Sequence, residues 1–144
     1  MTTARDLMTT CPTVLETATV ADVIALIGTQ PVTFLAVTNA AGRLVGILTE
    51  YDLVKPIHES FGFDTDAGVA GGYPAYLGWT PAQLRDLKVT EIMTNDPETV
   101  TPDEELETLA QIMFRNRRKV LPVVERGHLV GAVLRLDLVK KVLG

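Results

Sequence analysis

Two polar residues three positions apart, Thr49 and Asp52, are suited to bind an anion and a sugar. Thr49 stands where an apolar run, residues 44–48, gives way to a helical pattern. Its hydroxyl and the unpaired N–H groups of the first helical turn would therefore face the same anion. Asp52, one turn later, can accept two hydrogen bonds from the vicinal hydroxyls of a ribose. The pair fits one nucleotide, and it equally has the form of an N-cap followed by a first-turn acid, which is purely structural.

The stretches of sequence that surround Thr49 and Asp52 belong to a unit that occurs twice. Residues 4–12 return as residues 89–97, and residues 42–48 return as residues 127–133. Equivalent residues stand 85 positions apart, as in Met8 and Met93, Pro12 and Pro97, Gly46 and Gly131, and Asp52 and Asp137. A duplicated unit of this size packs against its twin about a pseudo-twofold axis, because one copy alone leaves an apolar face uncovered. The groove between the twins is the first place to look for function.

Each repeat shows the pattern of a short strand, a helix, a hairpin of two strands and a second helix, which indicates an α/β fold. In the first repeat, Thr19 is positioned to cap a helix, and residues 39–42 predict a hairpin turn with a late glycine. In the second repeat, Thr-Pro-Asp-Glu at residues 101–104 has the order of a capping box and predicts a helix that begins at Pro102. Arg-Gly at residues 126–127 predicts the second hairpin turn. The glycine inside each hairpin indicates a close backbone approach, either of a ligand or of another strand.

These patterns divide the chain into a first repeat at residues 1–55, an insert rich in glycine and aromatic residues at 56–88, and a second repeat at 89–144. Loops as long as this insert are usually functional or disordered, although residues 80–87 have a cap, a proline and leucine spacing that predict a helix. The aromatic residues of the insert fit a lid over a ligand, a dimer contact, or packing onto the side of the repeats. They are Tyr73, Tyr76 and Trp79.

Composition bounds the classes of function. At 144 residues and 47% hydrophobic content, the chain fits one compact domain or two small halves that share a core, and it should fold without a cofactor. The net charge of -5 argues against nucleic acid as a partner. A single cysteine excludes an internal disulfide, and neither a signal peptide nor an apolar run long enough to cross a membrane is evident. We therefore expect a cytoplasmic protein with no membrane partner.

Metal and catalytic sites are not expected. His58 and His128 are far apart in the sequence, and residues 64–68 resemble the start of a calcium loop but Ala75 stands where its glutamate should be. No short motif of a hydrolase, a zinc protease or a P-loop enzyme occurs, so we expect a protein that is not an enzyme. Cys11 aligns with Asp96 in the other repeat and is therefore predicted to be a small filler, buried or half-buried.

The duplicated Met-Thr…Pro openings, the Leu-Pro-Val strand of the second repeat and the Gly-Ile-Leu-Thr-x-x-Asp-Leu ending of the first together resemble a tandem pair of CBS domains, the Bateman module. The resemblance covers residues 4–54 and 89 to the C-terminus. It implies that the hairpin sheets of the two repeats pack together around up to two adenosine-nucleotide clefts. Modules of this family commonly dimerise into a disc, and they act as energy or ligand sensors.

The nucleotide motif of the family implies a ligand-binding role for four residues of the first repeat, Gly46, Ile47, Thr49 and Asp52. In the second repeat Leu134 takes the position of the threonine, so that cleft is expected to be degenerate or to take a ligand that has no phosphate there. In similar modules, cationic side chains just before the second hairpin reach the phosphates held by the first repeat. The resemblance gives this role to one or two of Arg117, Arg118 and Lys119, which would serve equally well as a solvated helix C-terminus. The adenine would lie near Thr13, Val14 and Ile47.

The sequence therefore predicts a non-catalytic regulatory module, homodimeric, with one competent cleft for AMP, ADP or ATP and no required cofactor. The alternative is a structural or dimerisation module whose clefts are vestigial and which acts through a protein partner. Leu134 and the large insert are the best support for that alternative.

Overall fold

The structure, a computed structural model, describes residues 1–29, 32–60 and 79–144. Its α/β elements follow the predicted order in both repeats. In chain order they are α1 (Ala4–Leu7), β1 (Thr13–Leu15), α2 (Val20–Ile27), β2 (Phe34–Thr38), β3 (Leu44–Thr49), α3 (Glu50–Ser60), α4 (Pro81–Arg85), α5 (Val89–Ile92), β4 (Thr94–Asn95), α6 (Leu106–Arg115), β5 (Val120–Glu125), β6 (His128–Leu134) and α7 (Arg135–Leu143).

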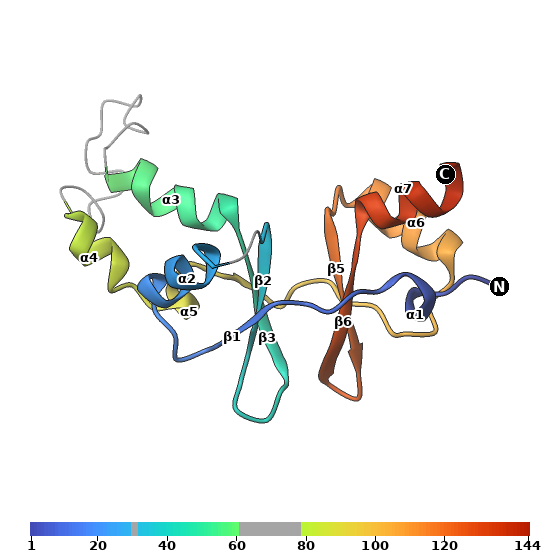
Figure 1. Ribbon diagram of the computed structural model, residues 1–144, viewed down its shortest axis with the longest axis horizontal. Helices are drawn as coiled ribbons and strands as arrows, with labels where there is room; N and C mark the ends of the chain where they lie inside the picture. Colours follow the sequence, from blue (N-terminus) through green and yellow to red (C-terminus); the bar gives the residue numbers. More distant parts are fainter. Residues whose placement is uncertain (30–31, 61–78) are drawn as a thin grey trace.

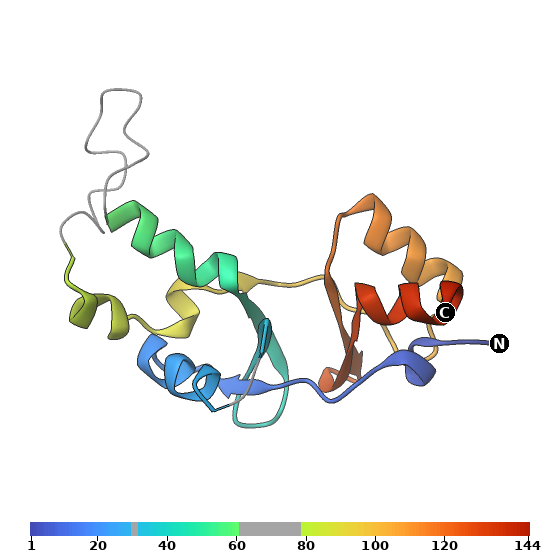
Figure 2. The same cartoon turned by 45° about the horizontal axis from the view of Figure 1, so that its top comes forward.

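Two β-hairpins stand side by side in the middle of the molecule, with the helices of each repeat on the outer sides (Figures 1 and 2). The first hairpin belongs to a sheet of order β1-β2-β3-β4, in which β1 is parallel to β2, and the second is the antiparallel pair β5-β6. Both predicted turns are confirmed, because Gly42 (φ 81°) ends the first loop, and Arg126 (φ 55°) and Gly127 (φ 84°) form the second. Among the described residues, no helix is long and apolar enough to span a bilayer.

The segment that opens each repeat packs on the other repeat. In the first half, β4 pairs with β3, and Val89 of α5 is fully buried against Val23 and Leu48. In the second half, Thr9 exchanges backbone hydrogen bonds of 2.9 and 3.0 Å with Ala132 of β6, and Ala4 of α1 is buried in that core. The chain from α1 to β1 therefore runs from one half to the other (Figure 1). Each half of the folded molecule therefore contains residues from both sequence repeats, 1–55 and 89–144.

The two segments that open the repeats and cross to the other half, residues 4–12 and 89–97, are the crossing segments. They explain the glycine inside each hairpin. A Cβ atom on Gly131 would lie 2.9 Å from the carbonyl oxygen of Thr9 and 3.2 Å from Sδ of Met8. A Cβ atom on Gly46 would lie 2.9 Å from the carbonyl oxygen of Thr94 and would collide with Sδ of Met93. Of the two approaches left open by the sequence, that of another protein segment is the one observed.

We predict that Gly46→Ala destabilises the protein by about 1–3 kcal/mol, because the added methyl group meets backbone that cannot retreat without breaking the pairing of β3 with β4. Urea unfolding monitored by circular dichroism measures the change. Gly28→Ala is the matched control, since its Cβ would meet only carbonyl oxygens at 3.5 Å and its φ is -67°. Equal stability of the two variants would contradict the role given to the crossing segment.

The helix starts agree with the sequence in the first repeat and in the insert, and they differ in the second repeat. Thr19 caps α2 and Thr80 caps α4, as predicted. The capping box predicted at residues 101–104 is wrong, because α6 begins at Leu106 with Glu105 as its N-cap. The backbone at 101–104 is used by the crossing segment instead: the carbonyl oxygens of Pro102 and Glu104 accept hydrogen bonds of 2.9 and 2.8 Å from N–H groups of α1.

The two hairpins share a core in which Cys11 is buried. Cys11 packs with Phe34 and Ala36 of the first hairpin and Ala132 of the second. Its prediction as a buried filler is confirmed, with 8% of the residue exposed. Burial raises the pKa of the thiol to about 11, although a hydrogen bond from the backbone at Ala36 acts in the opposite direction.

We predict that iodoacetamide alkylates Cys11 at pH 8 about 100-fold more slowly in the native protein than in the urea-unfolded protein, because the raised pKa depletes the reactive thiolate. The pKa of this thiol is higher in the folded state than in the unfolded state. Its contribution to the free energy of unfolding is therefore complete below the unfolded-state pKa and is lost as the pH rises toward 11. Mass spectrometry of alkylated protein over time measures the rates. Equal rates in the two states would contradict the burial of the thiol.

Candidate functional site

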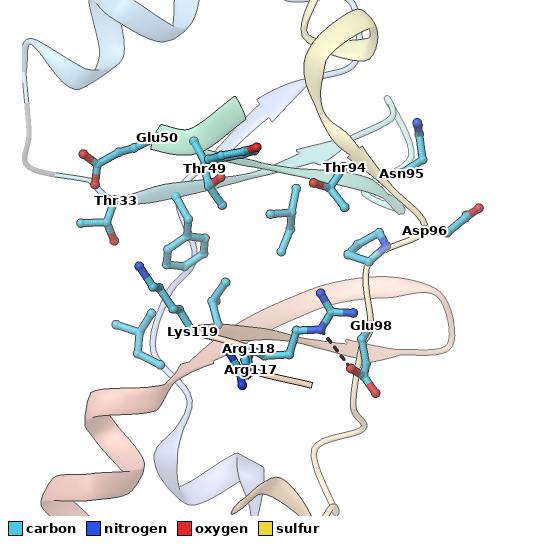
Figure 3. A pocket seen from close by; sticks show the side chains of 16 residues that line it. Thr33, Thr49, Glu50, Thr94, Asn95, Asp96, Glu98, Arg117, Arg118 and Lys119 are labelled. Carbon is cyan, nitrogen blue, oxygen red and sulfur yellow. Dashed lines mark hydrogen bonds and ion pairs between the residues drawn. The ribbon is translucent and has the colours of Figure 1, made fainter. Parts of the chain in front are cut away.

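A pocket of about 610 Å³ lies where the two hairpins meet, at the start of β2 and β5 and the end of β3 and β6 (Figure 3). Four apolar residues, two from each hairpin, form part of its wall: Phe34, Ile47, Val120 and Leu134. Hydroxyl groups are provided by Thr33, Thr49 and Thr94. The volume is within the range of sites that hold small-molecule ligands. Both repeats therefore build one pocket.

Thr49 lines this pocket at the junction of β3 and α3. Its backbone N–H and its hydroxyl both donate to Oδ2 of Asp52, at 2.9 and 3.2 Å. The Asp52 carboxylate thus closes the first turn of α3 and holds the threonine in place. Of the two interpretations of this pair, the capping interaction is directly visible in these hydrogen bonds. It leaves the oxygen lone pairs and the helix N-terminus beside the pocket.

The cationic residues enter the pocket from the turn between α6 and β5. Arg117, Arg118 and Lys119 all line it, and Arg117 has a left-handed backbone (φ 53°), which makes the turn tight. In Figure 3 the Lys119 side chain extends from the second repeat toward Thr33 and Thr49, whereas the Arg118 side chain extends toward Glu98. The two repeats therefore present a hydroxyl and positive charges to the same space.

Glu98 lies among these cations. Its carboxylate accepts a hydrogen bond of 3.1 Å from Nε of Arg118 and two from Nδ2 of Asn116, at 2.9 and 3.1 Å. The ion pair is partly exposed, with 47% of the Arg118 side chain and 30% of the Glu98 side chain accessible. The Arg118 guanidinium already has an acidic partner in the structure.

Five of the nine residues predicted to bind a ligand line the pocket, and four do not. The five are Ile47, Thr49, Arg117, Arg118 and Lys119. Gly46 lies under Met93, and Asp52 contacts Thr49 rather than the pocket. Thr13 and Val14 were expected beside the adenine, but β1 lies at the β2 edge of the sheet, with β2 and β3 between it and β4. The segment from β4 onward, residues 94–98, lines the pocket instead.

Sequence analysis missed the pocket residues that come from the crossing segment and from the other hairpin. Residues 94–98 line the pocket because β4 pairs with β3. Leu134 was assigned to a second cleft but lines this one together with Thr33 and Phe34, because both hairpins begin and end at the same edge. The sequence repeat could have predicted the contribution of residues 94–98. If the opening segment of each repeat covers the other repeat, both segments must cross between the halves.

The second repeat has the capping contact without the hydroxyl. The backbone N–H of Leu134 donates to Oδ2 of Asp137 at 3.2 Å, as Thr49 does to Asp52. The Leu134 side chain packs against the core shared by the hairpins and lines the pocket from the second repeat. Among the described residues, no group of three or more His, Cys, Asp and Glu side chains could hold a metal ion.

The insert is described only in part. Tyr73 and Tyr76 lie outside the described residues. Trp79 is half-buried and lines a shallow hollow with Gln83, Asp86, Leu87 and Glu91 at the side of the first repeat.

Comparison with known proteins agrees with this architecture. The CBS domain family matches residues 4–59 and again residues 89–144. The uncharacterized protein MJ1426 of Methanocaldococcus jannaschii is 31% identical over 94% of this chain and 88% of its own length. The chain is also 29% identical to the A-adding tRNA nucleotidyltransferase of Aquifex aeolicus, of which it spans only 14%.

Two solved structures are similar over nearly the whole chain. CBSX2 in complex with AMP has a TM-score of 0.75 and 26% identity, over 99% of this chain and 97% of that one. The cytosolic domain of the Mg²⁺ channel MgtE in complex with ATP has a TM-score of 0.70 and 28% identity, over 96% of this chain and 47% of that one. With its fold, its two matched repeats and its inter-repeat pocket, the chain belongs to the CBS-domain family and carries a tandem pair of CBS domains.

Proposed function

We propose that this chain is a regulatory module that binds an adenosine nucleotide in the pocket between its two repeats. One observation carries the proposal: Thr49, at the N-terminus of α3 in one repeat, and Arg117, Arg118 and Lys119 from the other repeat line a single pocket. A helix N-terminus and cationic side chains together favour a phosphate group, and the Thr49 hydroxyl donates to that group when it turns away from Asp52. The similar structures of CBSX2 with AMP and of MgtE with ATP support a nucleotide as the ligand.

The apolar part of the wall suits the base of the nucleotide. Phe34 and Ile47 of the first hairpin and Val120 and Leu134 of the second can cover an adenine ring on both sides. Asp52 acts in this proposal by holding Thr49, through the two hydrogen bonds that close the first turn of α3. A ligand that touches both repeats stabilises the arrangement it fits best, which is how binding would change the geometry of the module.

We predict that Thr49→Ala lowers the affinity for AMP by about tenfold, and that the double substitution Arg117→Ala and Lys119→Ala lowers it more, because charged partners of a phosphate contribute more than a neutral hydroxyl. Isothermal titration calorimetry of the full chain measures both. Thr19→Ala is the matched control, since Thr19 makes the same 2.9 and 3.2 Å contacts with Asp22 at the start of α2 and lies outside the pocket lining.

The control separates loss of a helix cap from loss of a ligand contact. Equal affinity in the wild type, the Thr49 variant and the double variant would refute the site. Absence of binding to AMP, ADP and ATP by the wild type would favour the structural module, which acts through a protein partner. The contacts of Asp52 with Thr49 and of Arg118 with Glu98 are the observation that favours this second candidate, because they engage both side chains within the protein.

A homodimer is the second part of the proposal. Helices α3 and α7, which follow the two hairpins, each expose apolar side chains three or four residues apart. These are Tyr51, Val54 and Ile57 on α3, and Leu136, Val139, Val142 and Leu143 on α7. Such a pair of exposed apolar stripes indicates a surface that another copy covers.

We predict that the double substitution Val54→Glu and Val139→Glu converts a dimer into a monomer, because it places two charges in the apolar contact. Sedimentation velocity measures the change in mass. Phe114→Glu is the control, because Phe114 is 88% exposed on α6 and belongs to neither stripe. A wild-type monomer, or a dimer that survives the double substitution, would contradict the proposed surface.

A further inference from the structure

The charges that line the pocket nearly cancel. Arg117, Arg118 and Lys119 are matched by three acidic residues, Glu50, Asp96 and Glu98. In Figure 3 the Asp96 side chain points away from the pocket, whereas Glu98 meets Arg118 inside it. A site built only to attract a polyphosphate would not place carboxylates beside its cations, because like charges repel the ligand.

Glu98 is held in this position by the second repeat. It accepts hydrogen bonds from the side chains of Asn116 and Arg118, all between 2.9 and 3.1 Å long. Its backbone belongs to the segment that leaves β4, so the carboxylate lies between the two repeats. Arg118 is thereby neutralised, and Arg117 and Lys119 remain to pair with a ligand in the pocket.

The remaining acidic residue stands on the other side of the pocket. Glu50 is the first residue of α3 and directly follows Thr49. Glu50 lines the pocket beside Thr49, so its negative charge opposes the accumulation of further phosphate groups there. Two available cations balance one phosphate group, whose charge is about −2 at neutral pH, but not a chain of three.

We infer that Glu98 limits the charge the pocket accepts and so makes it select a nucleoside monophosphate over the triphosphate. The inference rests on the proposed function, because it concerns the phosphate end of the same site. Glu98 acts by engaging Arg118 and by repelling additional phosphates, and it is a specificity-determining residue for the ligand.

The test compares AMP and ATP binding in the full chain, with EDTA present so that no divalent cation neutralises ATP. The wild type is expected to bind AMP more tightly than ATP. Glu98→Gln keeps the size of the side chain and an acceptor for Asn116, but it removes the charge and frees Arg118. We expect this variant to shift the ratio of the two affinities toward ATP by about tenfold, as expected from removing one repulsive charge and adding one free cation at partly exposed positions.

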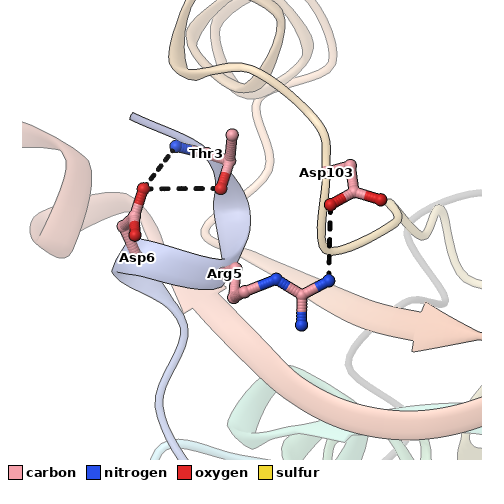
Figure 4. Close-up of polar contacts among 4 residues, drawn as sticks. All are labelled: Thr3, Arg5, Asp6 and Asp103. Carbon is pink, nitrogen blue, oxygen red and sulfur yellow. Dashed lines mark hydrogen bonds and ion pairs between the residues drawn. The ribbon is translucent and has the colours of Figure 1, made fainter. Parts of the chain in front are cut away.

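Asp103→Asn is the matched control. Asp103 forms an exposed ion pair of 3.3 Å with Arg5, beside the Thr3–Asp6 contact of α1, and is not among the residues that line the pocket (Figure 4). The substitution changes the net charge of the protein as Glu98→Gln does. It should leave the ratio of AMP to ATP affinity unchanged.

The outcomes distinguish this inference from the proposed function. AMP binding by the wild type with an unchanged affinity ratio in the folded Glu98→Gln variant overturns the inference and leaves the nucleotide site standing. A wild type that prefers ATP also overturns it, and this measurement decides the question if the variant does not fold. A wild type that binds none of the nucleotides overturns the proposed function itself.

Discussion

The structure depends on the crossing of two short segments between its halves. Each repeat has a core that its own residues leave open, and the segment that opens the other repeat closes it: Ala4 in one direction and Val89 in the other. Backbone pairing of Thr9 with Ala132 and of Asn95 with Gly46 holds these segments on the hairpins. Separating the halves would expose both cores at once, so the two repeats form one cooperative unit.

The same crossing builds the pocket. Because β4 lies beside β3, the chain that continues from it passes along the pocket and brings Glu98 to the cations of the second repeat. The pocket wall therefore comes from the first hairpin, the second hairpin and the segment that joins the repeats. A molecule bound there contacts all three, and its affinity must depend on how they are placed relative to one another.

Much of this architecture could be predicted from the sequence, because the signals for it are local. Gly42, Gly127 and Thr19 mark turns and a helix start through their own conformational and hydrogen-bonding preferences, and the structure has them as expected. The meeting of Thr49 with the arginine turn was expected from the family resemblance and the repeat.

The differences arise where distant segments decide the local structure. Residues 101–104 have a capping-box order, yet their carbonyl groups pair with α1 and the helix begins later. Thr13 and Val14 were expected in the site, but they lie in β1, at the edge of the sheet opposite β4. The equivalent segment of the other repeat lines the pocket. No pattern within one repeat contains the information that its opening segment belongs to its twin.

The exchange also bears on how such a chain could arise. A single repeat with the same opening segment would have to exchange that segment with a second copy, as in a domain-swapped homodimer. When two copies are joined in one gene, the exchange of opening segments takes place within one chain. After that fusion the copies are free to diverge, so one can keep a threonine where the other has a leucine, and a single ancestral surface can become a pocket with two unlike sides.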